Sequence, residues 1–469
     1  MIWPRPTTRD LAIVKFENCY MSEHKRALLK QWLDNGELRL QPLTFPQREL
    51  WEASPVPVGD VANHICCLIA LRGFITLQDC QAALQRVVER QEVLRLSFVP
   101  GKDRPLQMIR KGCKANLRFR ELSPLEGRLE GVEELAHEIF SEPFDLVQGP
   151  LYRAETLRRS ADDHVLVLAI HHAIADGWSL GVFVQDLVAA YVQAMMGRHG
   201  ALPPVRLSYT DWGAAERAFW QPAELEQRAA FWKSRLAETT RLWSTATLPE
   251  ARPGKPERWL SRIQADLGEA ARELARRSGT TLFNVLLAAF QIALSRWTGA
   301  EDILVGTPVA NRASQEVRET MGYCAGIVPL RGQIDRHRPF SAGLQMVHQA
   351  SIDSFANAMP FSELVRTLGD PRTPGRNPVF EVRFALQNHP VPDVVLPTLS
   401  ARLRMRSTGT SRFELGCELT EEGKGLEIAW LFQANLFSQK DIQKLDGMFR
   451  TVLAGACRSP ENRTAVLIT

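Results

Sequence analysis

The stretch HVLVLAIHHAIADGWS, residues 164–179, joins a strand-like apolar run to a polar turn and the start of a helix. The run 164–170 predicts a buried strand, and a helix is predicted over about 176–196. Asp176 stands where its side chain can cap the first turn of that helix. The two adjacent histidines of this stretch therefore leave the end of a buried strand directly before a helix.

The histidine pair, His171 and His172, is open to a structural and a chemical interpretation. In most sequences an adjacent pair is one core histidine with a polar neighbour. A half-buried imidazole held through one nitrogen, however, has a pKa near neutrality and can accept a proton. Gly177 permits close backbone approach, and the first N–H groups of the helix can stabilise a developing oxyanion. A metal site is not predicted, because adjacent histidines rarely converge on one ion.

Outside this stretch, strand-like and helix-like segments alternate, which predicts an α/β fold. A linker with glycines and paired prolines is expected near 197–215. Strands are predicted at 64–71, 94–99, 302–309, 379–387, 399–406, 413–420 and 426–432, and helices at 22–36, 77–91, 131–140, 280–297 and 438–457.

The composition describes a soluble globular chain of 469 residues, 45% hydrophobic and 23% charged. This length exceeds the roughly 250–300 residues at which one hydrophobic core stops growing, so two domains with a cleft are expected. The expected divisions are an N-terminal segment with a helix (1–37), an N-terminal lobe that carries the histidine turn (38–212) and a C-terminal lobe (213–469).

Charge and cysteine usage exclude several classes of protein. A formal charge of +4 spread over the chain gives no electrostatic reason to expect a nucleic-acid partner. Eight scattered cysteines form no CxxC pair and are typical of reduced thiols. No signal peptide or membrane span is predicted, so a cytoplasmic protein is expected.

The string from His171 to Gly177 resembles the HHxxxDG signature of nonribosomal peptide synthetase condensation domains, a family related to chloramphenicol acetyltransferase. Six further segments resemble the family's other motifs in their proper order. Gln91 replaces a usual histidine, and Gly326 and Ile327 replace an Asn-Thr pair. The resemblance covers about 38–460; the six segments are 43–51, 90–98, 209–212, 321–331, 360–361 and 376–378.

The resemblance implies two acyltransferase-like α/β lobes in a V, with a tunnel between them and a role for each residue of the turn. His172 would orient or deprotonate the acceptor amine, and Gly177 would lie beside the reacting carbonyl. His171, Asp176 and Arg312 would support the site, with Arg312 of the other lobe pairing with Asp176. Trp178, Gly326 and Ile327 are assigned to the tunnel, although Trp178 is also expected to be a packing residue.

The resemblance also implies amide-bond formation between two thioester-bound groups. An initiating, or starter, domain is expected, because no carrier-protein motif precedes the turn and Gly326 and Ile327 make their stretch more apolar. Such a domain joins a fatty acyl group to the first aminoacyl-carrier protein. The substrates would be the carrier's phosphopantetheine arm and an acyl-CoA or acyl-carrier donor, with no permanently bound cofactor and an adjacent adenylation domain.

Other functions remain open from the sequence. An elongation domain would take a peptidyl donor from a partner synthetase, and a free-standing acyltransferase would use a soluble acceptor. An epimerising relative would need a further base that the sequence does not assign. A silent recruitment domain would usually have lost the histidine that this chain keeps at His172.

Overall fold

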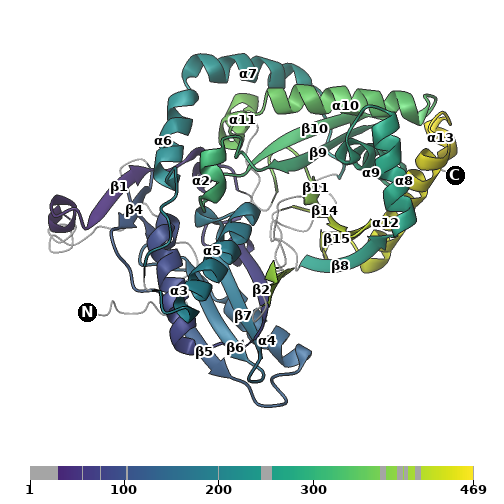
Figure 1. Ribbon diagram of the computed structural model, residues 1–469. Helices are drawn as coiled ribbons and strands as arrows, with labels where there is room; N and C mark the ends of the chain where they lie inside the picture. The colour runs from purple at the N-terminus through teal and green to yellow at the C-terminus, as the bar shows by residue number, and fades with distance from the viewer. Residues whose placement is uncertain are drawn as a thin grey trace.

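The computed structural model describes residues 30–467, apart from gaps at 55, 74, 102–103, 199, 244–255, 370–375, 388–393, 396–399 and 407–412. Its elements form two lobes, each built on a six-stranded sheet (Figure 1). Most of the predicted N-terminal helix at 22–36 lies outside the described residues, and the described part is helical at 30–34.

The sheet of the first lobe has the strand order β12-β13-β2-β7-β6-β5. Its central strand β7 is buried along nearly its whole length, as a continuous apolar run inside a covered sheet requires. Helices α3 (Leu77–Arg90) and α5 (Gly177–Met195) pack side by side on this lobe. The strands are β2 (His64–Arg72), β5 (Leu117–Glu121), β6 (Tyr152–Arg158), β7 (Asp163–His171), β12 (Val394–Val395) and β13 (Ser400–Arg406).

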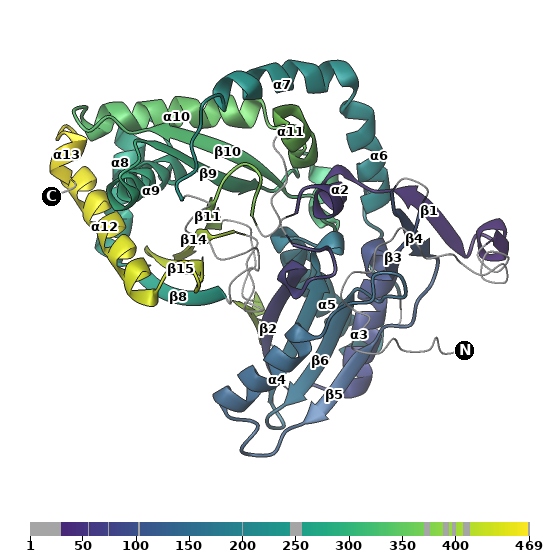
Figure 2. The ribbon, with the colours of Figure 1, turned by 180° about the vertical axis from the view of Figure 1, so that it is seen from behind.

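The sheet of the second lobe has the order β10-β9-β11-β14-β15-β8 and is bordered by helices α8, α9, α10 and α12 (Figure 2). Its strands are β8 (Pro256–Ile263), β9 (Asp302–Val309), β10 (Gly326–Gln333), β11 (Val382–Gln387), β14 (Leu415–Glu422) and β15 (Gly425–Gln433). The helices are α8 (Ala265–Arg277), α9 (Leu282–Thr298), α10 (Phe340–Ala356) and α12 (Gln439–Arg458).

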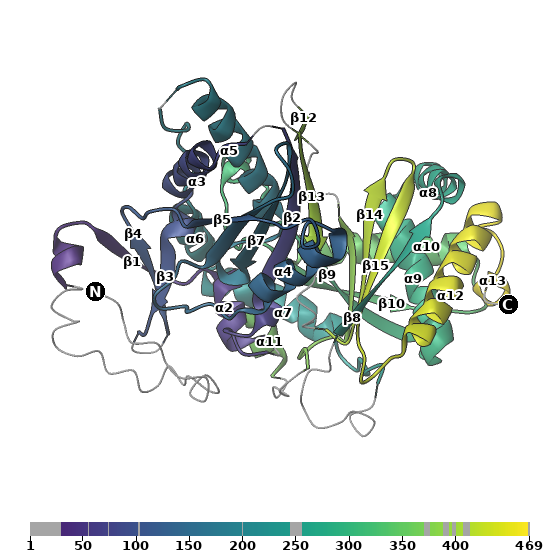
Figure 3. The ribbon, with the colours of Figure 1, turned by 90° about the horizontal axis from the view of Figure 1, so that it is seen from below.

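Strand β13 joins the first sheet although it comes late in the chain. It pairs antiparallel with β2 from Ser400 opposite Arg72 to Arg406 opposite Cys66, and Figure 3 shows the two strands side by side. Ala401 on this strand is buried in the core of the first lobe. The later part of the chain therefore contributes β13 to the first sheet, and the division of the chain between 212 and 213 stays a prediction.

Two smaller groups of elements complete the fold. A three-stranded sheet has the order β1-β4-β3, and further helices lie in or between the lobes. Helices α6 and α7 lead the chain from the first lobe to the second (Figure 1). These elements are β1 (Leu38–Pro42), β3 (Leu96–Val99), β4 (Leu106–Arg110), α2 (Phe45–Glu52), α4 (Leu129–Ser141), α6 (Tyr209–Phe219), α7 (Pro222–Arg235) and α11 (Phe361–Leu368).

The predicted linker at 197–215 is wrong at its C-terminal end, because helix α6 begins at Tyr209. The side chain of Ser208 accepts a hydrogen bond from the backbone N–H of Asp211 and so caps this helix. The Ser-x-x-Asp spacing at 208–211 is a helix-start pattern that the preceding prolines obscure. The mixed α/β class is as predicted.

Candidate active site

The turn between β7 and α5 places the residues of the HHxxxDG string at the end of a buried strand. His171 ends β7, a single 3-10 turn covers His172–Ile174, and α5 begins at Gly177. Asp176 is the N-cap of α5, as predicted, and forms a capping box with Ser179. The buried strand and the capped helix thus fix the turn from both sides.

Asp176 is the centre of a buried hydrogen-bond network. Its Oδ1 accepts from the backbone N–H and the hydroxyl of Ser179, at 3.0 and 2.9 Å. Its Oδ2 accepts from Arg312 Nη1 at 2.6 Å and from the backbone N–H groups of Cys324 and Ala325, both at 3.1 Å. Burial alone would raise the pKa of Asp176, but the charge of Arg312 and these hydrogen bonds hold it below its usual range.

This network ties the turn to the segment that leads into β10. Both side chains of the ion pair are almost fully buried, with 3% of Asp176 and 1% of Arg312 exposed. Arg312 Nη2 also donates to the carbonyl oxygen of Gly322, and Ser179 Oγ accepts from the N–H of Gly322. The structure therefore brings together Asp176 and Arg312, and a buried charge pair of this kind is costly to break on one side only.

His171 has both ring nitrogens engaged in hydrogen bonds within the protein. Its Nδ1 accepts from the backbone N–H of Ala173 at 3.1 Å, so the ring proton lies on Nε2. Nε2 donates to the carbonyl oxygen of Val58 at 2.9 Å. This fully buried imidazole is fixed as a neutral tautomer and can support the turn, but it presents no nitrogen to a substrate.

His64 lies directly opposite His171 across β2 and β7, with the ring centroids 5.9 Å apart. Its Nδ1 donates to the carbonyl oxygen of Phe140 at 2.9 Å, and the ring of Phe144 packs against it at 4.6 Å. Burial lowers the pKa of His64 to about 4 from its usual 6.5.

Acid should therefore loosen this part of the first lobe. Because the folded pKa is lowered, the unfolded chain binds the proton more readily, and stability is lost as the pH falls from about 6.5 toward 4. Between pH 7 and pH 5 we expect His64 to lower the free energy of unfolding by about 2 kcal/mol. Urea unfolding at both pH values measures this loss. His64→Asn keeps a donor near Nδ1 without the titration, so an equally steep pH dependence in that variant would contradict the assignment.

His172 differs from its neighbour because its side chain is half-buried rather than enclosed. Its Nδ1 is buried in the protein, although the residue as a whole is partly exposed. The ring of Tyr323 packs against it, with centroids 4.3 Å apart and an angle of 58° between the planes. A half-buried imidazole is the kind of group that can receive a proton or hold an amine.

Helix α2 fixes the backbone next to His172 through a side chain for which the sequence predicted no role. Gln47 is fully buried, and its Nε2 donates to the carbonyl oxygen of Ala173 at 3.0 Å and to Gln107 Oε1 at 3.1 Å. Its Oε1 accepts from the N–H of Thr44, which completes a capping box. The Thr-x-x-Gln spacing at 44–47 is the signal that could have located the start of this helix, but it does not reveal the contact with Ala173.

Gln91, which stands where the family usually has histidine, has a structural role. Its Nε2 donates to Asp186 Oδ2 at 2.8 Å and to the carbonyl oxygen of Glu319 at 3.0 Å. Its Oε1 accepts from the backbone N–H of Met321 at 2.9 Å. The amide therefore joins α5 to the segment before β10, and this substitution does not remove a group from the turn.

The remaining predicted site residues fall into two groups. Trp178 is half-buried at the start of α5, and its Nε1 donates to the carbonyl oxygen of Arg318 at 2.9 Å. Gly326 is half-buried at the start of β10, opposite Val309. Ile327, in contrast, is 9% exposed and packs in the core of the second lobe. Because successive side chains of a strand point to opposite faces of the sheet, Ile327 lies on the other face from position 326. Its burial therefore gives no support to its assignment to a tunnel.

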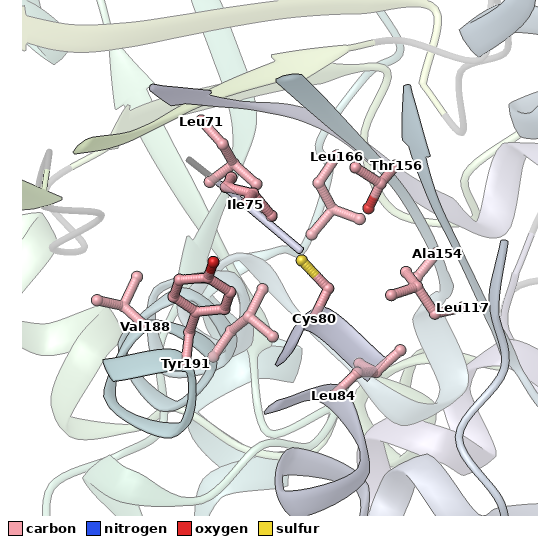
Figure 4. A pocket seen from close by; sticks show the side chains of 11 residues that line it. Leu71, Ile75, Cys80, Leu84, Leu117, Ala154, Thr156, Leu166, Val188 and Tyr191 are labelled. Atoms are coloured by element: carbon pink, nitrogen blue, oxygen red, sulfur yellow. The ribbon is translucent and has the colours of Figure 1, made fainter. Parts of the chain in front are cut away.

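Two cavities lie elsewhere. One of about 30 Å³ lies inside the first lobe, where Cys80 and Leu84 of α3 face Val188 and Tyr191 of α5 (Figure 4). It is apolar and too small for an acyl chain. The other, of about 280 Å³, lies beside α10 and the end of β10. No residue of the β7–α5 turn lines either cavity.

Neither a metal site nor a single membrane-spanning helix is found within 30–467 outside the gaps. No group of three or more His, Cys, Asp or Glu side chains there could hold a metal ion. No single helix of this part of the chain is long and apolar enough to cross a bilayer, and only the bent pair of α8 and α9 meets the length and composition required.

A family model for the condensation domain matches residues 38–467. The chain belongs to the condensation-domain family. The family and its two-lobe α/β fold are as predicted from the HHxxxDG string, and condensation domains of nonribosomal peptide synthetases form amide bonds by acyl transfer.

Much longer synthetases are among the relatives of this condensation domain. It is 28% identical to tyrocidine synthase 2 of Brevibacillus parabrevis, over 97% of this chain and 12% of that protein. It is 30% identical to the phosphinothricin tripeptide synthetase PhsC of Streptomyces viridochromogenes, over 86% of this chain and 38% of that protein. The chain thus spans only a part of the length of these relatives.

Solved structures share the fold. The first condensation domain of the CDA synthetase superposes with a TM-score of 0.76 and 21% identity, covering 91% of this chain and 98% of that one. The X-domain from teicoplanin biosynthesis gives a TM-score of 0.78 and 24% identity, covering 90% and 96%. At these identities the likeness extends to the fold alone.

Proposed function

We propose that this condensation domain joins a thioester-bound acyl group to the amine of an aminoacyl group on a carrier protein. The observation that carries the proposal is the half-buried ring of His172, which stands on a turn fixed by the buried pair of Asp176 and Arg312. The enclosed tautomer of His171 leaves His172 as the imidazole of the pair that can meet a substrate.

In the proposed reaction the amine nitrogen attacks the thioester carbonyl carbon, a C–N bond forms, and the C–S bond breaks. His172 orients the amine or accepts its proton, which then passes to the leaving thiolate. Since an α-amine has a pKa of about 7.7–8.0, part of it is already unprotonated near neutrality, and orientation contributes strongly. The N–H of Gly177, at the amino end of α5, is proposed to stabilise the oxyanion.

The proposed partners are carrier proteins, whose phosphopantetheine arms present the substrates, and an adjacent adenylation domain. The names of the relatives, which are peptide synthetases, support this assignment. No resident cofactor is required by the reaction. We propose that the protein is cytoplasmic, and the unbridged cysteines among the described residues support this location.

For the donor we propose a fatty acyl group, which makes this a starter domain. Gly326 supports the assignment, because among the described residues a Cβ there would meet only a methyl group of Val309, at 3.5 Å, and Val309 and Ile327 make this strand end apolar. An elongation domain with a peptidyl-carrier donor is the second candidate, and an acyltransferase that uses a soluble amine is the third.

Intact-mass measurement of a carrier protein loaded with an amino acid tests these candidates. We expect the carrier to gain the mass of an acyl group when it is mixed with this chain and acyl-CoAs of different lengths. Transfer from a peptidyl-carrier donor alone would replace the starter assignment by elongation, whereas transfer from a fatty acyl-carrier alone would keep the starter assignment with a carrier-bound donor. Acylation of the free amino acid but not of the loaded carrier would favour the soluble-acceptor enzyme.

A further inference from the structure

Tyr323 is the aromatic side chain that packs against the half-buried ring of His172. Their centroids are 4.3 Å apart, which places the two rings in van der Waals contact. Tyr323 itself is 3% exposed and belongs to the core of the first lobe, although it lies far along the chain in the segment before β10. The contact therefore joins a reacting group to a distant part of the sequence.

The backbone around Tyr323 is held on both sides. Its carbonyl oxygen accepts from the hydroxyl of Tyr209 at 3.0 Å, and the next two N–H groups, of Cys324 and Ala325, donate to Asp176. Gly322 packs so closely on Tyr209 that a Cβ there would lie 2.1 Å from the tyrosine ring. The position of the Tyr323 ring is thus set by the same network that fixes the turn.

The hydroxyl of Tyr323 reaches helix α2. It donates to Glu49 Oε1 at 3.3 Å, two residues after the Gln47 that holds the carbonyl oxygen of Ala173. Helix α2 therefore contacts two neighbours of His172, the backbone of Ala173 and the hydroxyl of the tyrosine that packs on the imidazole. The next residue back, Arg48, donates to Glu363 of α11 at 2.9 Å and connects this helix to the second lobe.

We propose that Tyr323 is a positioning residue that holds the imidazole of His172 in the orientation needed for amide formation. This inference rests on the proposed function. The tyrosine ring blocks rotation of the imidazole toward it and so limits the orientations that the imidazole can take. An aromatic ring within about 6 Å also attracts a cation, so the contact favours the imidazolium that forms if His172 takes the amine proton.

Three variants of the full chain test the proposal. Tyr323→Leu removes the ring, Tyr323→Phe keeps it without the hydroxyl, and Tyr191→Leu is a matched loss of a buried tyrosine away from the turn. We expect Tyr323→Leu to lower kcat about 10- to 100-fold with little change in KM for the loaded carrier. Tyr323→Phe should recover kcat to within about threefold of wild type, because the ring contact is retained. Tyr191→Leu should leave kcat unchanged, with thermal melting recorded for all variants.

A second measurement does not depend on turnover. The rate at which diethylpyrocarbonate modifies His172, followed by peptide mass, should rise at least about threefold in Tyr323→Leu but not in Tyr191→Leu, because the imidazole loses a covering ring. An active wild type whose Tyr323→Leu variant keeps its kcat and modification rate would overturn the inference. An inactive wild type in which the modification rate still rises would remove the proposed function while leaving the contact intact.

Discussion

Replacement of His172 by alanine is expected to lower the rate of carrier acylation by about 10²- to 10⁴-fold, the range for loss of a positioned acid–base group. The fold should survive, because the side chain is half-buried and begins a short 3-10 turn rather than filling the core. Intact-mass time courses with the loaded carrier measure the rate, and thermal melting checks the fold.

The pH dependence of this loss separates the two roles of His172. If it mainly removes a proton, the loss should shrink above the amine pKa of about 7.7–8.0, where the amine is already free. If it mainly orients the amine, the loss should be the same at pH 7 and pH 9. His137→Ala removes an exposed histidine of α4 and is the matched control. Equal rates for His172→Ala and His137→Ala would exclude His172 from the reaction.

Replacement of Asp176 by alanine is expected to destabilise the protein by about 3–5 kcal/mol, because it leaves the guanidinium of Arg312 buried without its partner. The same change removes the N-cap of α5 and the acceptor for the N–H groups of Cys324 and Ala325. Urea unfolding measures the loss of stability, and we expect activity to fall with it since the turn is released.

Two comparisons assign this loss to the buried pair. Asp211→Ala removes an exposed acid from the first turn of α6 and should cost less than about 1 kcal/mol. The double variant Asp176→Ala, Arg312→Met removes both charges and should be more stable than Asp176→Ala alone. A soluble Asp176→Ala protein with the stability and activity of wild type would refute the role of the pair.

The sequence was most informative where local pattern decides structure. The apolar run of β7 and the capping side chain of Asp176 are local signals, and the structure has both where they were predicted. The pairing of Asp176 with Arg312 came from the resemblance to a family, because no local pattern relates positions so far apart. The structure places these two side chains in direct contact.

Contacts between distant segments explain what the sequence did not reveal. Gln47 contacts the carbonyl oxygen of Ala173 from 126 positions earlier in the chain, and Tyr323 packs on His172 from a segment far along the chain, so no local pattern relates either side chain to the turn. At Ile327 the sequence change is visible, but its structural consequence is not. The exchange of a polar pair for Gly326 and Ile327 is visible in the sequence, but the strand alternation that buries one and not the other depends on the register of β10 with β9.

The late strand β13 also affects how this protein can be made. On the ribosome, β2 is synthesised early but receives one of its two neighbours only when Ser400–Arg406 has emerged. Until then the nascent chain carries an unpaired, largely apolar strand edge, which is a template for intermolecular association. The first sheet can therefore close only after residue 406 has been synthesised, and expressing the first lobe without β13 would leave that edge of β2 open.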